Sequence, residues 1–183
     1  MIWNRSNTIG MALPSCGFCE GTGMCDLRHG KATRPCDCVF RNIFRACYQT
    51  FKTCAESGQA FGTISWDFVP GGGRNRMYSR KREEFLADFC LVAKRVLTPS
   101  DYKTMVWYFL EGATWQECCG RLGMSRGNFF HTVYRIERVA GKAFAETEPY
   151  ALFPGYAYFS DAKVSQLRLD PPVRCQQWEL AAA

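Results

Sequence analysis

Two close pairs of cysteines constrain the fold of this chain more than any other feature of its sequence. Cys16 and Cys19 form a C-x-x-C pair, and Cys36 and Cys38 form a C-x-C pair after a loop of 16 residues. Pairs at such spacings can grip one tetrahedral ion through a tight turn. Four thiolates, with no position left for a carboxylate or water, predict a closed structural Zn²⁺ site. Cys25 and His29 lie inside the loop and are candidate substitutes for one ligand.

Other uses of clustered cysteines fit this sequence less well. The first fifteen residues lack the apolar run of a secretory leader, which predicts a cytoplasmic protein. Disulfides rarely persist in that compartment. A thioredoxin-like redox pair has a strand before it and a helix directly after it, whereas here Pro14 precedes the first pair and Gly21 and Gly23 follow it. A metal site is therefore the favoured interpretation.

Composition and charge set the broad class of the protein. The chain is 47% hydrophobic and 15% aromatic, and it has no continuous apolar run long enough for a membrane span, so we expect a folded protein without a membrane partner. The net charge of +6 is compatible with a polyanionic partner. The basic residues predicted to contact phosphates are Arg74, Arg76, Arg80, Lys81 and Arg82.

Apolar periodicity predicts a mainly α fold. We expect a zinc knuckle with one helix, followed by a helix-turn-helix domain of three to four helices. The predicted segments are a flexible N-terminus (1–15), the knuckle and its helix (16–60), a strand and basic connector (61–82), the helix-turn-helix domain with an aromatic C-terminal anchor (83–160) and a flexible tail (161–183).

Helix-boundary residues in the second half of the chain are unusually clear. Thr98 followed by a proline is a typical N-cap, and Thr114 with Glu117 forms a capping-box pattern. Gly123 and Ser125 predict the end of that short helix and the start of a long one.

Residues 97–140 resemble region four, the promoter-reading C-terminal domain of bacterial sigma factors. The resemblance lies in the run FLEG (109–112), in T-x-x-E at 114–117, in Leu122-Gly123 and in Met124-Ser125. It implies a helix-turn-helix whose second helix enters the major groove of DNA. The residues expected to contact DNA are Arg126, Asn128, His131, Thr132, Arg135 and Arg138. Phe130 and Tyr134 are expected on the same exposed face, against thymine methyls or another protein.

The first cysteine pair carries a second resemblance. C-x-x-C-x-G-x-G at 16–23 is similar to the zinc modules of DnaJ-type chaperones and of phage antiterminators of the Q type. The whole chain is also similar to uncharacterised proteobacterial proteins carried on prophages and genomic islands. These resemblances imply a zinc module, without a chaperone activity.

The leading hypothesis is a zinc-stabilised, DNA-binding transcriptional regulator of the bacterial cytoplasm, with double-stranded DNA as its partner. Two alternatives stay open: a module that binds RNA polymerase in the manner of an antiterminator, and a binder of single-stranded RNA. We do not expect an enzyme, because the chain has two histidines and no nucleophile with a base at a recognisable spacing.

Overall fold

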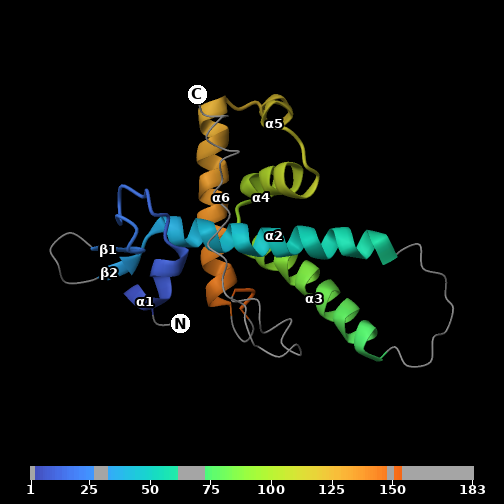
Figure 1. Cartoon of the computed structure of the whole chain (residues 1–183). Helices are drawn as coiled ribbons and strands as arrows, with labels where there is room; N and C mark the ends of the chain where they lie inside the picture. Colours follow the sequence, from blue (N-terminus) through green and yellow to red (C-terminus); the bar gives the residue numbers. More distant parts are fainter. Residues whose placement is uncertain (1–2, 27–32, 62–72, 148–150, 154–183) are drawn as a thin grey trace.

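The computed structural model describes residues 3–26, 33–61, 73–147 and 151–153, and its mainly helical architecture confirms the predicted fold class (Figure 1). In chain order the elements are α1 (Arg5–Thr8), the 3₁₀ helix η1 (Ile9–Met11), β1 (Met24–Asp26), β2 (Thr33–Pro35), α2 (Asp37–Phe61), α3 (Gly73–Val96), α4 (Pro99–Met105), the π-helix η2 (Val106–Leu110), α5 (Trp115–Leu122) and α6 (Arg126–Glu146). The two short strands pair antiparallel, with Met24 opposite Pro35.

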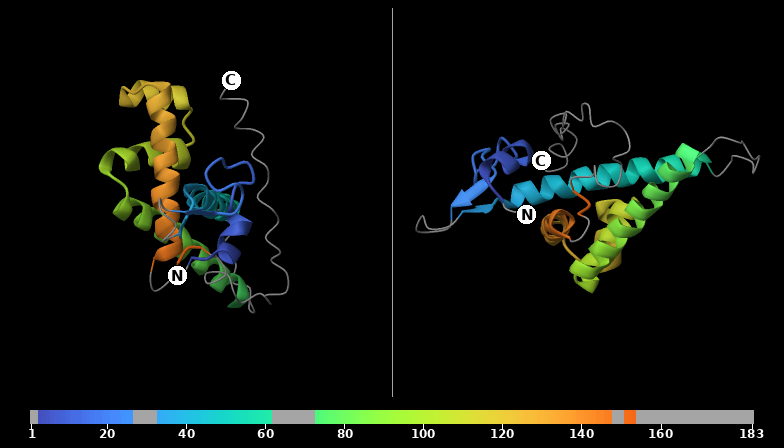
Figure 2. Two further views of the ribbon diagram at one scale, coloured as in Figure 1. Left: turned by 90° about the vertical axis from the view of Figure 1, so that its left-hand side faces the viewer. Right: turned by 90° about the horizontal axis from the view of Figure 1, so that it is seen from below.

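The crossing of α2 and α6 organises the molecule. The two helices cross steeply, and α3 runs back beneath α2 from the far end (Figures 1 and 2). The crossing is close because Gly141 has no side chain: a Cβ there would overlap the carbonyl group of Phe40. Around it, the rings of Phe44 and Phe144 stack at 5.9 Å, and Phe89 of α3 lies 4.8 Å from Phe144. Burial of these aromatic rings accounts for much of the apolar stabilisation.

The N-terminal half of α6 projects beyond α2 and packs against α4 and α5 (Figure 1). An apolar cluster separate from the main core lies here and is built on Cys118, Phe129 and Val133. The ring of Tyr108 meets that of Phe129 edge-on at 5.1 Å. This cluster fixes α5 across the first turns of α6.

The helix boundaries predicted between Thr98 and Ser125 are confirmed. Thr98 accepts a hydrogen bond from the Asp101 N–H, and the capping box of Thr114 and Glu117 is complete. Gly123 ends α5 at φ 63°, a conformation in which other residues are strained. Ser125 then caps α6 by accepting from the Asn128 N–H.

A buried ion-pair network joins α2 to α6, and the sequence patterns did not indicate it. The side chain of Glu137 is 6% exposed and accepts hydrogen bonds from Arg41 at 2.8 Å and from Arg45 at 2.9 Å. Both arginines extend from α2 across to α6. Their charges compensate a carboxylate whose burial alone would be costly.

The prediction of an unstructured N-terminus is wrong for residues 3–15, which contain α1 and η1. Thr8 is fully buried against Gly23, and its hydroxyl donates to the Thr22 carbonyl oxygen. Trp3 packs edge-on against Phe40 at 5.4 Å. These contacts come from residues distant in the sequence, so local composition did not reveal them.

The connector prediction for 61–82 is also corrected. Phe61 ends α2, and α3 already begins at Gly73, so residues 73–82 of the expected connector are helical. The run from 74 to 82 contains no proline, glycine or β-branched residue, so it extends the helix readily. The strand was expected at 61–68: its first residue, Phe61, belongs to α2, and residues 62–68 lie outside the described residues.

Part of the expected aromatic anchor is described. Leu152 is buried, and the Phe153 N–H donates to the Phe144 carbonyl oxygen at 3.0 Å, so residues 151–153 fold back on the end of α6. The rest of the anchor, 154–160, and the expected tail, 161–183, lie outside the described residues.

Candidate metal centre and the adjacent groove

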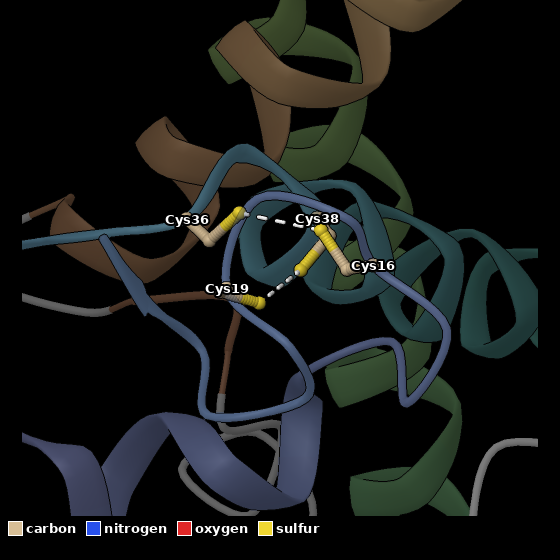
Figure 3. A group of neighbouring side chains, drawn as sticks. All are labelled: Cys16, Cys19, Cys36 and Cys38. Atoms are coloured by element: carbon tan, nitrogen blue, oxygen red, sulfur yellow. Dashed lines mark hydrogen bonds between the residues drawn. The ribbon is translucent and has the colours of Figure 1, made fainter. Parts of the chain in front are cut away.

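The four predicted cysteine ligands converge (Figure 3). Their sulfur atoms all lie within 4.8 Å of one another, with Cys16 and Cys36 at 3.7 Å and Cys19 and Cys38 at 3.6 Å. Four sulfurs bound tetrahedrally at the Zn–S distance of about 2.3 Å stand about 3.8 Å apart. The group can therefore hold one metal ion, and its donor set of four thiolates suits a soft or borderline ion.

Backbone geometry positions the first pair. A tight turn follows Cys19, with Glu20 at φ 49° and Gly21 at φ 78°. The Glu20 N–H donates to the Cys16 carbonyl oxygen at 2.8 Å, and the Thr22 hydroxyl donates to the Cys19 carbonyl oxygen at 2.6 Å. Left-handed backbone at these positions folds the two sulfurs to the same side.

The second pair is placed by the hairpin and by α2. The Cys36 N–H donates to the Gly23 carbonyl oxygen at 2.8 Å, which draws the end of β2 against the first turn. Cys36 immediately precedes α2, and Cys38 lies in its first turn. The N-terminal end of a helix carries partial positive charge, which favours thiolates there.

Thiol pKa values differ within the cluster. Burial raises the pKa of Cys38 to about 11 and raises that of Cys36 further. Burial acts in the same direction on Cys16, but hydrogen bonds from the Phe18 and Cys19 N–H groups outweigh it and lower its pKa to about 7. A bound cation would favour the thiolate form at each position.

Of the two predicted substitute ligands, Cys25 is described by the structure and is not part of the group. The Cys25 thiol donates to the Phe18 carbonyl oxygen at 3.7 Å and lies outside the four-sulfur group. His29 lies outside the described residues. None of the described cysteines forms a disulfide.

Asp37, between the two ligands of the second pair, links this cysteine module (residues 16–26 and 33–38) to α6. Its carboxylate accepts a hydrogen bond from Arg138 at 3.2 Å and lies 3.9 Å from Arg34. Asp37, which lies between Cys36 and Cys38 in the sequence, therefore connects the cysteine cluster to α6.

A groove with a volume of about 1010 Å³ runs between the cysteine module and α6. Its lining residues come from both sides: Leu13, Cys16, Gly17, Phe18, Cys25, Asp26, Arg34, Cys36, Asp37 and Cys38 from the module side, Arg41 from α2, and His131, Tyr134, Arg135 and Arg138 from α6. Four arginines and two aspartates give this lining an excess of positive charge.

The predicted DNA-contacting residues divide into three groups. Arg126 and Asn128 are exposed in the first turn of α6 and do not line the groove. The Arg126 guanidinium lies 5.3 Å from the Trp115 ring and 5.9 Å from the Phe130 ring. Phe130 is half-buried and packs against the α5–α6 cluster, so its predicted exposure is wrong.

Thr132 was also predicted on the exposed face, and that placement is wrong. It is 7% exposed because it lies on the side of α6 that faces α4. Its hydroxyl accepts a hydrogen bond from Arg135 at 3.3 Å. Arg135 in turn donates to the buried Asp101 carboxylate at 2.6 Å, which holds its guanidinium against α4.

The remaining predicted residues, His131, Arg135 and Arg138, line the groove. Tyr134 lies beside them, and the Arg41 guanidinium covers its ring at 4.1 Å. Arg41 was missed by sequence reasoning, because its place beside α6 depends on the α2–α6 crossing. Its spacing with Arg45, one helical turn apart on a polar edge of α2, was the available signal.

The basic residues that were predicted in a connector belong to α3. Lys81 and Arg82 are half-buried, and neither lines the groove. Arg74, Arg76 and Arg80 lie in the α3 backbone, while their side chains fall outside the described part of the chain. Phosphate contacts from these five residues stay a prediction.

No protein-family model matches this chain, and no curated protein or solved structure matches it significantly. Among the described residues, no helix combines the length and apolar character needed to cross a membrane.

Proposed function

We propose that this protein is a zinc-stabilised, DNA-binding transcriptional regulator of the bacterial cytoplasm, in which α5 and α6 act as a helix-turn-helix. One observation carries the proposal. The first turn of α6 is capped by Ser125 and supported from behind by α5, while Arg126 and Asn128 are exposed on it. Such a helix start can enter the major groove end-on.

Each exposed residue has a role in this proposal. Arg126 would read guanine through its O6 and N7 atoms, and Asn128 would read adenine through N6 and N7. The rings of Trp115 and Phe130 limit the positions that the Arg126 guanidinium can adopt. Because less rotamer freedom is then lost on binding, the arginine is better prepared for a bidentate contact.

Phosphate contacts would come from the α6 residues farther along the helix. His131 and Arg138 are exposed on the groove side, about one and three turns beyond the base-reading positions. Contacts of this kind fix the position of the helix on the duplex and carry no sequence information.

Zinc is the ion that we propose for the cysteine cluster, because four thiolates without an open position are typical of structural zinc. When bound, it would supply folding energy to the module and no reactive chemistry. The module then holds Asp37 in place against Arg138, and so it supports the polar face of α6.

A salt titration tests the duplex-binding part directly. Purified, zinc-loaded protein is titrated into a labelled duplex of random sequence at several salt concentrations between about 50 and 200 mM. We expect log K to fall linearly with log salt concentration, and Arg138→Gln to reduce that slope. Absence of binding to duplex DNA at the lowest salt concentration would overturn the proposal.

A further inference from the structure

The groove beside the metal centre presents an aromatic ring that the fold does not use. Phe18, between the cysteines of the first pair, is 88% exposed and lines the groove. The other large side chains of the module are more covered. A phenyl ring that is exposed to water is unfavourable for the folded state, because it gains no packing contacts. Exposed apolar groups of this kind often mark binding sites.

The opposite wall of the groove is cationic. Arg41 comes from α2, and Arg135 and Arg138 come from α6. Their carboxylate partners are Glu137, Asp101 and Asp37 in that order, so the guanidinium groups are held in fixed positions. The side chains of Arg135 and Arg138 nevertheless remain 49% and 45% exposed, which leaves donors directed to solvent.

We propose that this groove binds a segment of single-stranded nucleic acid, with an unpaired base stacked on Phe18 and the phosphates along Arg135 and Arg138. A cationic track beside an exposed aromatic platform is the combination that single strands require. The two walls supply the two parts separately: the ring stands on the cysteine module, and two of the arginines stand on α6.

The size of the groove suits a short single strand. Its volume of about 1010 Å³ lies at the upper end of the range for small-ligand pockets, which is room for a few nucleotides. The face of a base is available to an aromatic side chain only when the base is unstacked. The Arg41 guanidinium lies over one face of the Tyr134 ring, and Tyr134 is 45% exposed whereas Phe18 is 88% exposed, so Phe18 is the more accessible of these two rings for a base.

This inference shares Arg138 with the proposed function but does not depend on duplex reading. The two nucleic acids would be recognised by different residues: a base of the single strand by Phe18, and the bases of the duplex by Arg126 and Asn128. Substitutions at these positions therefore separate the two activities.

The test uses the full, zinc-loaded chain and three labelled strands of about twelve nucleotides: oligo-dT, oligo-U and an abasic deoxyribose strand of equal length. Phe18→Ala is compared with Leu91→Ala, which removes an apolar side chain of α3 that is 57% exposed and does not line the groove. We expect Phe18→Ala to weaken oligonucleotide binding about tenfold and Leu91→Ala to leave it unchanged. Both variants should retain the wild-type metal content.

The abasic strand isolates stacking from charge. Wild type and Phe18→Ala should bind it equally and weakly, because it offers phosphates without a base. A preference for oligo-dT or for oligo-U identifies the natural strand, and either preference supports the proposal. Equal affinity of Phe18→Ala and wild type for both base-containing strands would overturn it, as would wild-type affinity that is independent of the bases.

Failure of the two proposals can be told apart. If Asn128→Ala weakens duplex binding and leaves strand binding intact, both proposals stand. Strand binding by a protein that does not bind duplex would contradict the proposed function alone. Loss of the Phe18 effect in a protein that binds duplex would contradict the groove proposal alone.

Discussion

The Arg138 guanidinium donates a hydrogen bond to the Asp37 carboxylate at 3.2 Å, across 101 residues of sequence. Asp37 stands between Cys36 and Cys38, so the polar face of α6 is tied directly to the candidate metal centre. Glu137, the neighbour of Arg138, is held by α2 as well. The cysteine module and α6 therefore depend on each other for their positions.

Loss of a cysteine ligand should release the metal and unfold the cysteine module. In Cys19→Ser the cluster has three sulfurs, so we expect bound zinc to fall well below one ion per chain, because structural zinc binding is coupled to folding. Cys25→Ser is the matched control and should keep the full metal content, since its sulfur lies outside the cluster. Elemental analysis after dialysis measures both, and metal loss in Cys25→Ser would contradict the ligand set.

Two glycine-to-alanine substitutions should act in opposite directions. Gly141→Ala places a Cβ against the Phe40 carbonyl group and should lower the free energy of unfolding by about 3 kcal/mol. Gly120 lies in α5 with open space around it, so Gly120→Ala should raise the free energy of unfolding by about 1 kcal/mol. Urea denaturation measures both. Equal effects of the two substitutions would refute the close crossing of α2 and α6.

Removal of the buried carboxylate at Glu137 should be strongly destabilising. Glu137→Ala leaves Arg41 and Arg45 without their shared partner and should cost about 3 kcal/mol of unfolding free energy. Glu111 is exposed, and Glu111→Ala should change that free energy by about 0.5 kcal/mol or less. Chemical denaturation curves of the two variants decide the point, and similar midpoints would count against a buried network.

The capping box of α5 should make stability depend on pH. Hydrogen bonds from the backbone N–H and the hydroxyl of Thr114 lower the pKa of Glu117 below its ordinary value of 4.5. A lowered pKa in the folded state stabilises the fold above that value, and the effect is lost as pH falls through the lowered pKa. Glu117→Gln should therefore be less stable than wild type at neutral pH.

The difference in denaturation midpoint between wild type and Glu117→Gln should shrink as the pH falls from neutral to below the ordinary carboxyl pKa of 4.5. A difference that stays constant across this range would show that the carboxylate charge has no part in the cap.

Local signals predicted the parts of the fold that depend on local chemistry. The helix starts at Thr98, Thr114 and Ser125 follow from side chains that accept backbone hydrogen bonds within the next turn, so neighbouring residues determine them. The group of four cysteines that could hold a metal ion was likewise recognisable, because a chelating turn requires short spacings.

Features that depend on contacts between distant segments were not predictable in this way. Thr132 is buried because it lies on the side of α6 that faces α4. The hydrogen-bond partner of Arg135 is Asp101, which is 34 residues away in the sequence. Helical periodicity alone placed Thr132 with the exposed residues, because the boundary between the two faces depends on where neighbouring helices pack. The groove could not be predicted either, because its lining residues are brought together by the β1–β2 hairpin and by the crossing of α2 and α6.

Selection of bound sequences from a random duplex library tests the central claim most directly. Zinc-loaded wild type, Asn128→Ala and the control Gly120→Ala are each used to retain duplexes, which are then sequenced. The proposed function predicts one enriched motif for wild type and Gly120→Ala, with adenine preference lost at one position in Asn128→Ala. No enriched motif from a folded, metal-loaded protein would contradict a role in reading DNA sequence.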